Sequence, residues 1–142
     1  MRAHRSTTMA ILMAMALLAG PASAQTAAPV GAQVYFIEPA DGASVKSPVT
    51  VKFGLKGMGV APALVEWPGT GHHHLLINRD ASPGGSPIPN DPTAVHFGGG
   101  QTEAQIPLAP GTHTLLLQLG DYQHIPHDPP LVSPKITITV VP

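Results

Sequence analysis

The chain contains eight histidines, and the spacing of those beyond residue 70 suits metal coordination. Three are consecutive, His72, His73 and His74, and they run directly into the apolar residues 75–77. Alternate side chains of a strand share a face, so His72 and His74 should point to one side and His73 to the other. Two imidazoles placed in this way are about 7 Å apart at the backbone, within reach of one metal ion.

Further imidazoles and one carboxylate follow at positions that a β-sandwich would bring to the same end. His124 and His127 lie three residues apart in a proline-rich loop, and His96 precedes the glycines 98–100. Asp121 is available as a ligand or as an acceptor that orients an imidazole. The predicted metal ligands are His72, His74, His124 and His127, with His96 and Asp121 as supporting candidates.

The available donors restrict the metal. The chain has no cysteine, and Met58 is its only methionine beyond residue 15. Imidazole and carboxylate donors without sulfur favour Zn²⁺, Cu²⁺ or a similar divalent ion. A small polar ligand held by the same side chains is the other binding hypothesis. Metal affinity should fall as the pH drops through about 6.5, where imidazoles become protonated.

Two other functions compete with a binding module. Histidines can bond backbone carbonyls and tie loops together, and for His113 we prefer this structural role. The chain would then be a structural or protein-interaction domain with a partner in the cell envelope. The third hypothesis, a copper/zinc redox metalloenzyme, is an analogy between β-sandwiches that carry a His-x-His pair. We expect a binding module rather than an enzyme.

The first 24 residues have the pattern of an export signal. Arg2 and Arg5 precede an apolar run, residues 9–19, and small residues follow at 22–24. This run is shorter than the roughly 20 residues that span a bilayer, so we expect no membrane span after cleavage. The pattern predicts a signal peptide over residues 1–24 and a periplasmic or secreted protein.

Cleavage there would leave a flexible lead-in, residues 25–32, and one domain, residues 33–142. Without Arg2 and Arg5, five of the seven basic residues remain against eight acidic ones, a net charge of −3 with neutral histidines. A mildly acidic chain without a basic run argues against nucleic acid and anionic membranes as partners.

The alternation of apolar and polar residues predicts an all-β fold. Pro- and Gly-rich turns separate about seven short strands, at residues 34–37, 49–55, 73–78, 94–97, 102–108, 112–120 and 136–140. This pattern favours an immunoglobulin-like antiparallel β-sandwich, with a small open barrel as the alternative. Trp67, in a Pro/Gly-rich loop, is expected to fill the core.

Several long motifs carry a family resemblance. They are Gly71-His72-His73-His74-Leu75-Leu76-Ile77, His96-Phe97-Gly98-Gly99-Gly100-Gln101-Thr102-Glu103, Pro110-Gly111-Thr112-His113-Thr114-Leu115, and Gly120-Asp121 with His124-Ile125-Pro126-His127. In these motifs, and from Val34 to Val140 as a whole, the chain resembles the bacterial domain-of-unknown-function family 4399. The resemblance implies an exported bacterial domain of about this size, and the family name carries no established activity.

Overall fold

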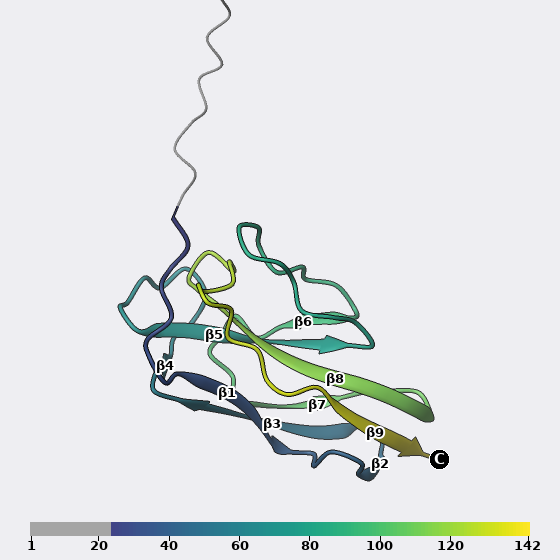
Figure 1. Cartoon of the computed structure of the whole chain (residues 1–142). Coiled ribbons are helices and arrows are strands. Elements are labelled where there is room, and N and C mark those ends of the chain that lie inside the picture. Colours follow the sequence, from purple (N-terminus) through teal and green to yellow (C-terminus); the bar gives the residue numbers. More distant parts are fainter. Residues whose placement is uncertain (1–23) are drawn as a thin grey trace, which may run out of the picture.

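Nine strands form two sheets within residues 24–142, the part of the chain that this computed structural model describes (Figure 1). The smaller sheet is antiparallel and has the order β1 (Gln33–Glu38), β3 (Val49–Lys56), β7 (Glu103–Ile106). The larger sheet has the order β2 (Ser44–Lys46), β9 (Ile136–Val141), β8 (Gly111–Gly120), β5 (Thr70–Ile77), β4 (Gly59–Val60), and β6 (Ala94–His96) also pairs with β5.

The main core lies between the two sheets, and alternation along each strand decides which side chains enter it. In β3, Val49, Val51 and Phe53 are buried, while Thr50 and Lys52 are partly exposed. In β5 and β8 the residues of odd number point inward, so that the core includes Leu75, Ile77, Leu115, Leu117 and Leu119. Each fully buried aliphatic side chain contributes about 1.5–3 kcal/mol. The even-numbered residues of β5, His72 and His74 among them, therefore occupy the outer face.

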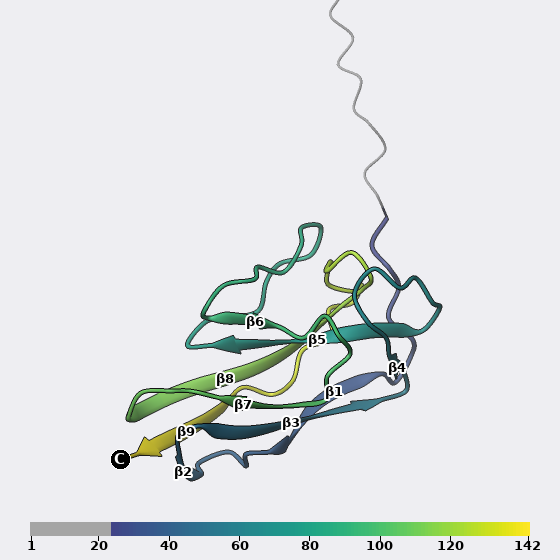
Figure 2. The same ribbon diagram turned by 180° about the vertical axis from the view of Figure 1, so that it is seen from behind.

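Loops cover that outer face, as the view from behind shows (Figure 2). At one end a second apolar cluster forms there from Leu76, Ile88, Ala94 and Leu116. The loop between β5 and β6 is bonded to the sheet, because the amide N–H of Ser82 donates to Gln118 Oε1 at 2.8 Å and Gln118 Nε2 donates to the Ser82 carbonyl at 2.9 Å. The other end of the outer face holds the histidines.

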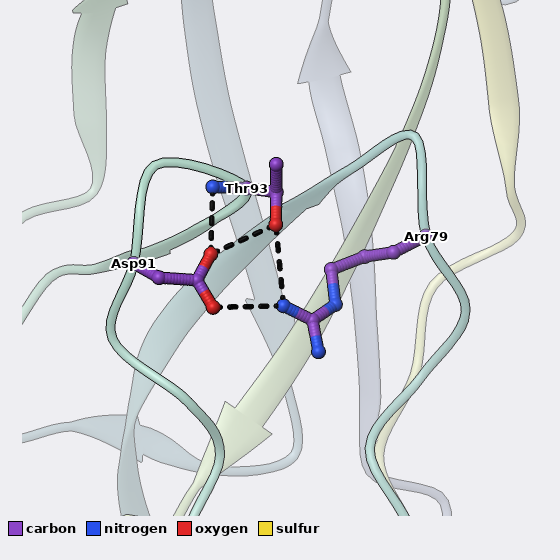
Figure 3. A network of polar contacts seen from close by, with 3 residues as sticks. All are labelled: Arg79, Asp91 and Thr93. Atoms are coloured by element: carbon purple, nitrogen blue, oxygen red, sulfur yellow. Dashed lines mark hydrogen bonds and ion pairs between the residues drawn. The ribbon is translucent and has the colours of Figure 1, made fainter.

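A polar network closes the loop between β5 and β6 (Figure 3). Arg79 Nη1 lies 3.1 Å from Asp91 Oδ2 and donates to Thr93 Oγ1 at 3.3 Å. Asp91 Oδ1 also accepts from the amide N–H and the hydroxyl of Thr93, both at 2.8 Å. These contacts hold the two ends of the loop together, so that β6 returns beside β5.

The predicted all-β sandwich is confirmed, and two sheets are present where the alternative was a barrel. All seven predicted strands are present, together with the short β2 and β4 that the sequence did not indicate. These two pair in parallel with β9 and β5, so the larger sheet is mixed rather than purely antiparallel. The immunoglobulin-like subclass stays a prediction.

Residues 25–32, the predicted flexible lead-in, make main-chain contacts with the rest of the fold. Ala27 forms a bridge with Asp128, and Ala32 precedes β1 directly. The predicted signal peptide lies, apart from Ala24, outside the described residues. Among residues 24–142 no helix is long and apolar enough to cross a membrane.

Candidate metal site

Three histidines on the outer face of the larger sheet come together through strand pairing. His74 of β5 is the cross-strand partner of His96 of β6, with ring centroids 5.1 Å apart. His72, two residues earlier on the same face, has its ring centroid 4.8 Å from that of His74 and 5.0 Å from that of His96. Each of the three offers a ring nitrogen, and these nitrogens lie within 4.8 Å of one another.

A fourth imidazole comes from the loop after β8. The ring centroid of His124 lies 4.7 Å from that of His96, 4.9 Å from that of His72 and 6.1 Å from that of His74. His72 and His74 are fully buried, whereas His96 and His124 are half-buried. The two half-buried rings therefore form the solvent side of the cluster, where an ion would enter. We call His72, His74, His96 and His124 the histidine cluster.

Asp121 shapes the turn that carries His124. Its Oδ1 accepts from the amide N–H groups of Gln123 and Ile125, both at 2.9 Å. Its Oδ2 accepts from the Thr26 hydroxyl at 2.8 Å. His124 itself has φ 69°, a left-handed conformation that is uncommon for residues other than glycine. The carboxylate predicted as a supporting ligand thus has both oxygens engaged in holding the loop.

Two glycines make room for the imidazole rings. A Cβ added at Gly98 would lie 2.2 Å from Cε1 of His96, and one added at Gly120 would lie 2.8 Å from Cε1 of His74. Contacts below 3.0 Å are not tolerated without movement, so any side chain at these positions would displace a ring. Backbone therefore packs directly against the histidine cluster at both places.

The ring nitrogens of the buried histidines have no hydrogen-bond partner among the described residues. This holds for both nitrogens of His72 and His74 and for Nε2 of His96, and also for both nitrogens of His73 and His127, which lie outside the cluster. His113 provides the contrast, because its Nδ1 lies 3.0 Å from Asn78 Nδ2 and its Nε2 lies 2.8 Å from the Ala109 carbonyl. Leaving a buried polar group unpaired costs about 1–3 kcal/mol. His113 therefore has the hydrogen bonds expected of a histidine that ties loops together, and His72 and His74 do not.

Burial keeps the imidazoles of His72, His74 and His96 neutral. Burial first, and the neighbouring imidazoles second, lower the pKa of His72 to about 4 and that of His74 to about 3. Burial also lowers the pKa of His96, with His124 as the second cause. The Asp121 carboxylate opposes part of the lowering of the His72 pKa. Neutral imidazole is the form that binds metal, so His72, His74 and His96 are in the form suited to coordination at neutral pH.

The other histidines lie elsewhere. His127, predicted as a ligand, is fully buried beside main-chain groups of Thr70 and Leu119. Like His124, it does not belong to the set of ring nitrogens within 4.8 Å of one another, which comprises His72, His74 and His96. His73 points into the core, where its ring centroid lies 5.2 Å from that of Phe53. His113 lies at the opposite end of β8 from the cluster.

Trp67 does not fill the core. Its side chain is 70% exposed, on the loop between β4 and β5. With Val65, Thr70 and Tyr122 it lines a cavity of about 360 Å³ at the histidine end of the sandwich. The expectation was wrong because β5 begins at Thr70, three residues after Trp67, and its buried residues start only at Gly71.

The donor set fits a divalent transition metal. Zn–N bonds are about 2.0–2.1 Å long, so tetrahedral ligand nitrogens are about 3.4 Å apart. The nitrogens of His72, His74 and His96, within 4.8 Å of one another, would need to close by small ring rotations. Four imidazoles without sulfur or a free carboxylate suit Zn²⁺ or Cu²⁺.

Fold and site together define a β-sandwich domain with a buried histidine cluster on the outer face of one sheet. Residues 51–141 match the family model described as Domain of unknown function (DUF4399), and since the match covers more than half of the sequence, the chain belongs to this family. The match takes in every member of the cluster and begins within β3. Neither a curated protein nor a solved structure matches the chain significantly.

Proposed function

We propose that this protein binds one divalent metal ion, Zn²⁺ or Cu²⁺, through His72, His74 and His96, with His124 as the fourth ligand. The observation that carries this proposal is the convergence of three ring nitrogens within 4.8 Å, on buried or half-buried side chains. Metal coordination would compensate for the unpaired nitrogens of His72 and His74. The strands β5 and β6 carry three of the proposed ligands.

The proposed role is that of a binding or carrier module. Catalytic zinc sites keep an open position for water or substrate, whereas four protein ligands close the coordination sphere. The nearby carboxylate of Asp121 is bonded to Thr26, Gln123 and Ile125, which leaves it unsuited to serve as a general base. A redox metalloenzyme is the competing proposal, and turnover by the metal-loaded protein would favour it.

Equilibrium dialysis of the tag-free protein against Zn²⁺ and Cu²⁺ tests the proposal. We expect one ion per chain, and loss of that ion in the double variant His72→Ala/His74→Ala. The matched control is His113→Ala, which removes an imidazole at the opposite end of β8. Absence of stoichiometric uptake, or equal uptake by the double variant, would overturn metal binding. Uptake of a small polar ligand alone would instead favour the other binding hypothesis.

A protein-interaction domain is the second candidate, and one surface favours it. On the loop between β4 and β5, Leu64, Val65 and Trp67 are exposed by 78%, 47% and 70%. Leu64 also has φ 66°, so an apolar side chain is presented to solvent from a left-handed backbone. Exposed apolar groups of this kind often mark contacts with other proteins. If this surface binds a partner protein, the double variant Leu64→Ser/Trp67→Ser should lose that contact while its metal uptake is unchanged.

We further propose that the protein acts in the periplasm or outside the cell. The support is the pattern of residues 1–24, with basic residues, an apolar run and a small-residue cleavage site. N-terminal sequencing of the protein recovered from a periplasmic or culture fraction should read from Gln25. Recovery of chains that begin at Met1, and only in the cytoplasm, would contradict export.

A further inference from the structure

Residues 25–28 lie along the loop that carries His124. The amide N–H of Asp128 donates to the Thr26 carbonyl at 2.9 Å, and the amide N–H of Ala28 donates to the Asp128 carbonyl at 2.8 Å. Together these bonds form a short parallel bridge at Ala27 and Asp128. The segment before β1 is therefore paired with the end of the 121–128 loop.

Side chains of the same segment hold the loop at two further points. The Thr26 hydroxyl donates to Asp121 Oδ2 at 2.8 Å, and Gln25 Nε2 donates to the Pro126 carbonyl at 2.9 Å. Asp121 is 4% exposed. Because an unpaired acceptor is costly in a buried place, the Thr26 hydroxyl and the Asp121 carboxylate stabilise each other's positions. Thr26 thus contacts the residue whose other oxygen forms the turn leading to His124.

The position of His124 is determined by a loop, whereas the positions of the other three candidate ligands are determined by paired strands. His72, His74 and His96 belong to paired strands. His124 is held through its main chain, by its amide N–H to the Asp121 carbonyl at 2.9 Å and by the Ile88 amide N–H to its carbonyl at 2.8 Å. The position of the fourth imidazole therefore follows the position of Asp121.

We propose that residues 25–28 are a positioning segment of the metal site, which holds the 121–128 loop so that His124 becomes the fourth ligand of the ion. This inference rests on the metal binding proposed above. With the segment in place the ion has four imidazoles and no open position. When the segment is loosened, three imidazoles remain and water takes the fourth position, the arrangement of catalytic zinc sites. Residues distant in sequence from the histidines thus decide between a closed and an open site.

The test uses protein with ¹⁵N-labelled histidines, titrated with Zn²⁺ while the ring-nitrogen shifts of each histidine are recorded. In the unsubstituted protein all four cluster histidines should shift with Zn²⁺. In Thr26→Val, which loses the hydroxyl but keeps the shape, His72, His74 and His96 should still shift and His124 should not. The affinity should fall about 10- to 100-fold, as is usual when a group that orients a ligand is removed.

Two matched variants separate positioning from general damage. Thr26→Ser keeps the hydroxyl and should restore both the affinity and the His124 shift. Thr70→Val removes a hydroxyl at the same end of the fold that donates to the Trp67 carbonyl at 2.7 Å, and it should change neither. If Thr26→Val does not fold, Gln25→Ala, which loses only the bond to Pro126, should show the same selective effect at His124, with a smaller loss of affinity.

The outcomes are distinct. A Thr26→Val protein with the original affinity and a shifted His124 would overturn the positioning role of residues 25–28, while metal binding itself would stand. Equal loss of the shifts at all four histidines would also overturn it, because the effect would not be specific to the fourth ligand. Absence of any shift in the unsubstituted protein would overturn the proposed function instead.

Discussion

His74 and His96 face each other across neighbouring strands, with their ring centroids 5.1 Å apart on the outer face of the larger sheet. This relationship results from the β5–β6 register, which also pairs Leu75 with Val95 and Leu76 with Ala94. Two of the candidate ligands are therefore placed by main-chain hydrogen bonding rather than by a mobile loop. A site built in this way is largely formed before the metal arrives.

The first prediction is that His74 lowers the free energy of unfolding of the metal-free protein. Both nitrogens of His74 are buried without a partner among residues 24–142. We expect His74→Leu, which has a similar volume, to raise the free energy of unfolding of the metal-free protein by about 1–3 kcal/mol. The same substitution should abolish metal binding. Urea unfolding in the presence of a chelator measures the first effect.

His113 gives the opposite expectation. Its ring bonds Asn78 and the Ala109 carbonyl, so His113→Leu should lower the free energy of unfolding by about 1 kcal/mol and leave metal binding intact. A loss of stability in His74→Leu equal to that in His113→Leu would indicate that the clustered histidines serve the fold.

The second prediction concerns pH and the metal-free protein. Burial lowers the pKa of His72 and His73 to about 4 and that of His74 to about 3, whereas in the unfolded chain each is near 6.5. Between these values the unfolded chain binds protons that the folded chain does not. The free energy of unfolding is therefore highest above pH 6.5 and decreases as the pH falls toward 4. Each histidine contributes up to about 1.4 kcal/mol per pH unit.

Urea midpoints of the metal-free protein between pH 7.5 and 5 measure this dependence. The His74→Leu protein should show a shallower loss, since one of the histidines with a lowered pKa is absent. Equal midpoints at pH 7.5 and 5 in the unsubstituted protein would contradict the predicted burial of neutral imidazoles. The same low pKa values imply that metal binding persists below pH 6.5, further than histidines with ordinary pKa values would allow.

The third prediction concerns the glycines that pack against the rings. Gly120→Ala and Gly98→Ala would bring a methyl group against His74 and His96, so both should weaken Zn²⁺ binding by displacing a ligand ring. Gly59→Ala is the control, because its Cβ would meet only Thr70 at an ordinary 3.5 Å. Isothermal titration measures the three affinities. Unchanged Zn²⁺ affinity in Gly120→Ala and Gly98→Ala would show that the positions of the His74 and His96 rings do not affect metal binding.

The fourth prediction is that metal stabilises the fold. An ion that binds the folded chain alone, at 100 times its dissociation constant, adds about 2.7 kcal/mol to the free energy of unfolding. We expect this gain with Zn²⁺ in the unsubstituted protein and none in His72→Ala/His74→Ala. Thermal unfolding with and without Zn²⁺ provides the comparison, and an equal gain in both proteins would place the ion elsewhere.

The candidate ligands on β5 could be predicted from the sequence because successive side chains of a strand point to opposite faces of the sheet. This alternation places His72 and His74 on one face and sends His73 to Phe53 in the core. The glycines after His96 indicated that it would reach the same end of the fold. Its pairing with His74 could not be foreseen, since a three-residue strand at the end of a long loop has no sequence signal for its partner.

The positions of the histidines in the loop after β8 were harder to predict, because the conformation of this loop depends on contacts with residues distant in sequence. His124 and His127 appeared equivalent, three residues apart between prolines. Asp121 and Thr26 shape the turn, and the left-handed backbone of His124 completes it. One imidazole then joins the histidine cluster while that of His127 is buried beside Thr70 and Leu119.

The most direct test is a crystal structure of the Zn²⁺-soaked protein with anomalous data collected on both sides of the zinc absorption edge. We predict one anomalous peak per chain, about 2.0–2.1 Å from a ring nitrogen of each of His72, His74, His96 and His124. A peak elsewhere in the chain, or none between these four rings, would contradict the assignment of the cluster as a metal site.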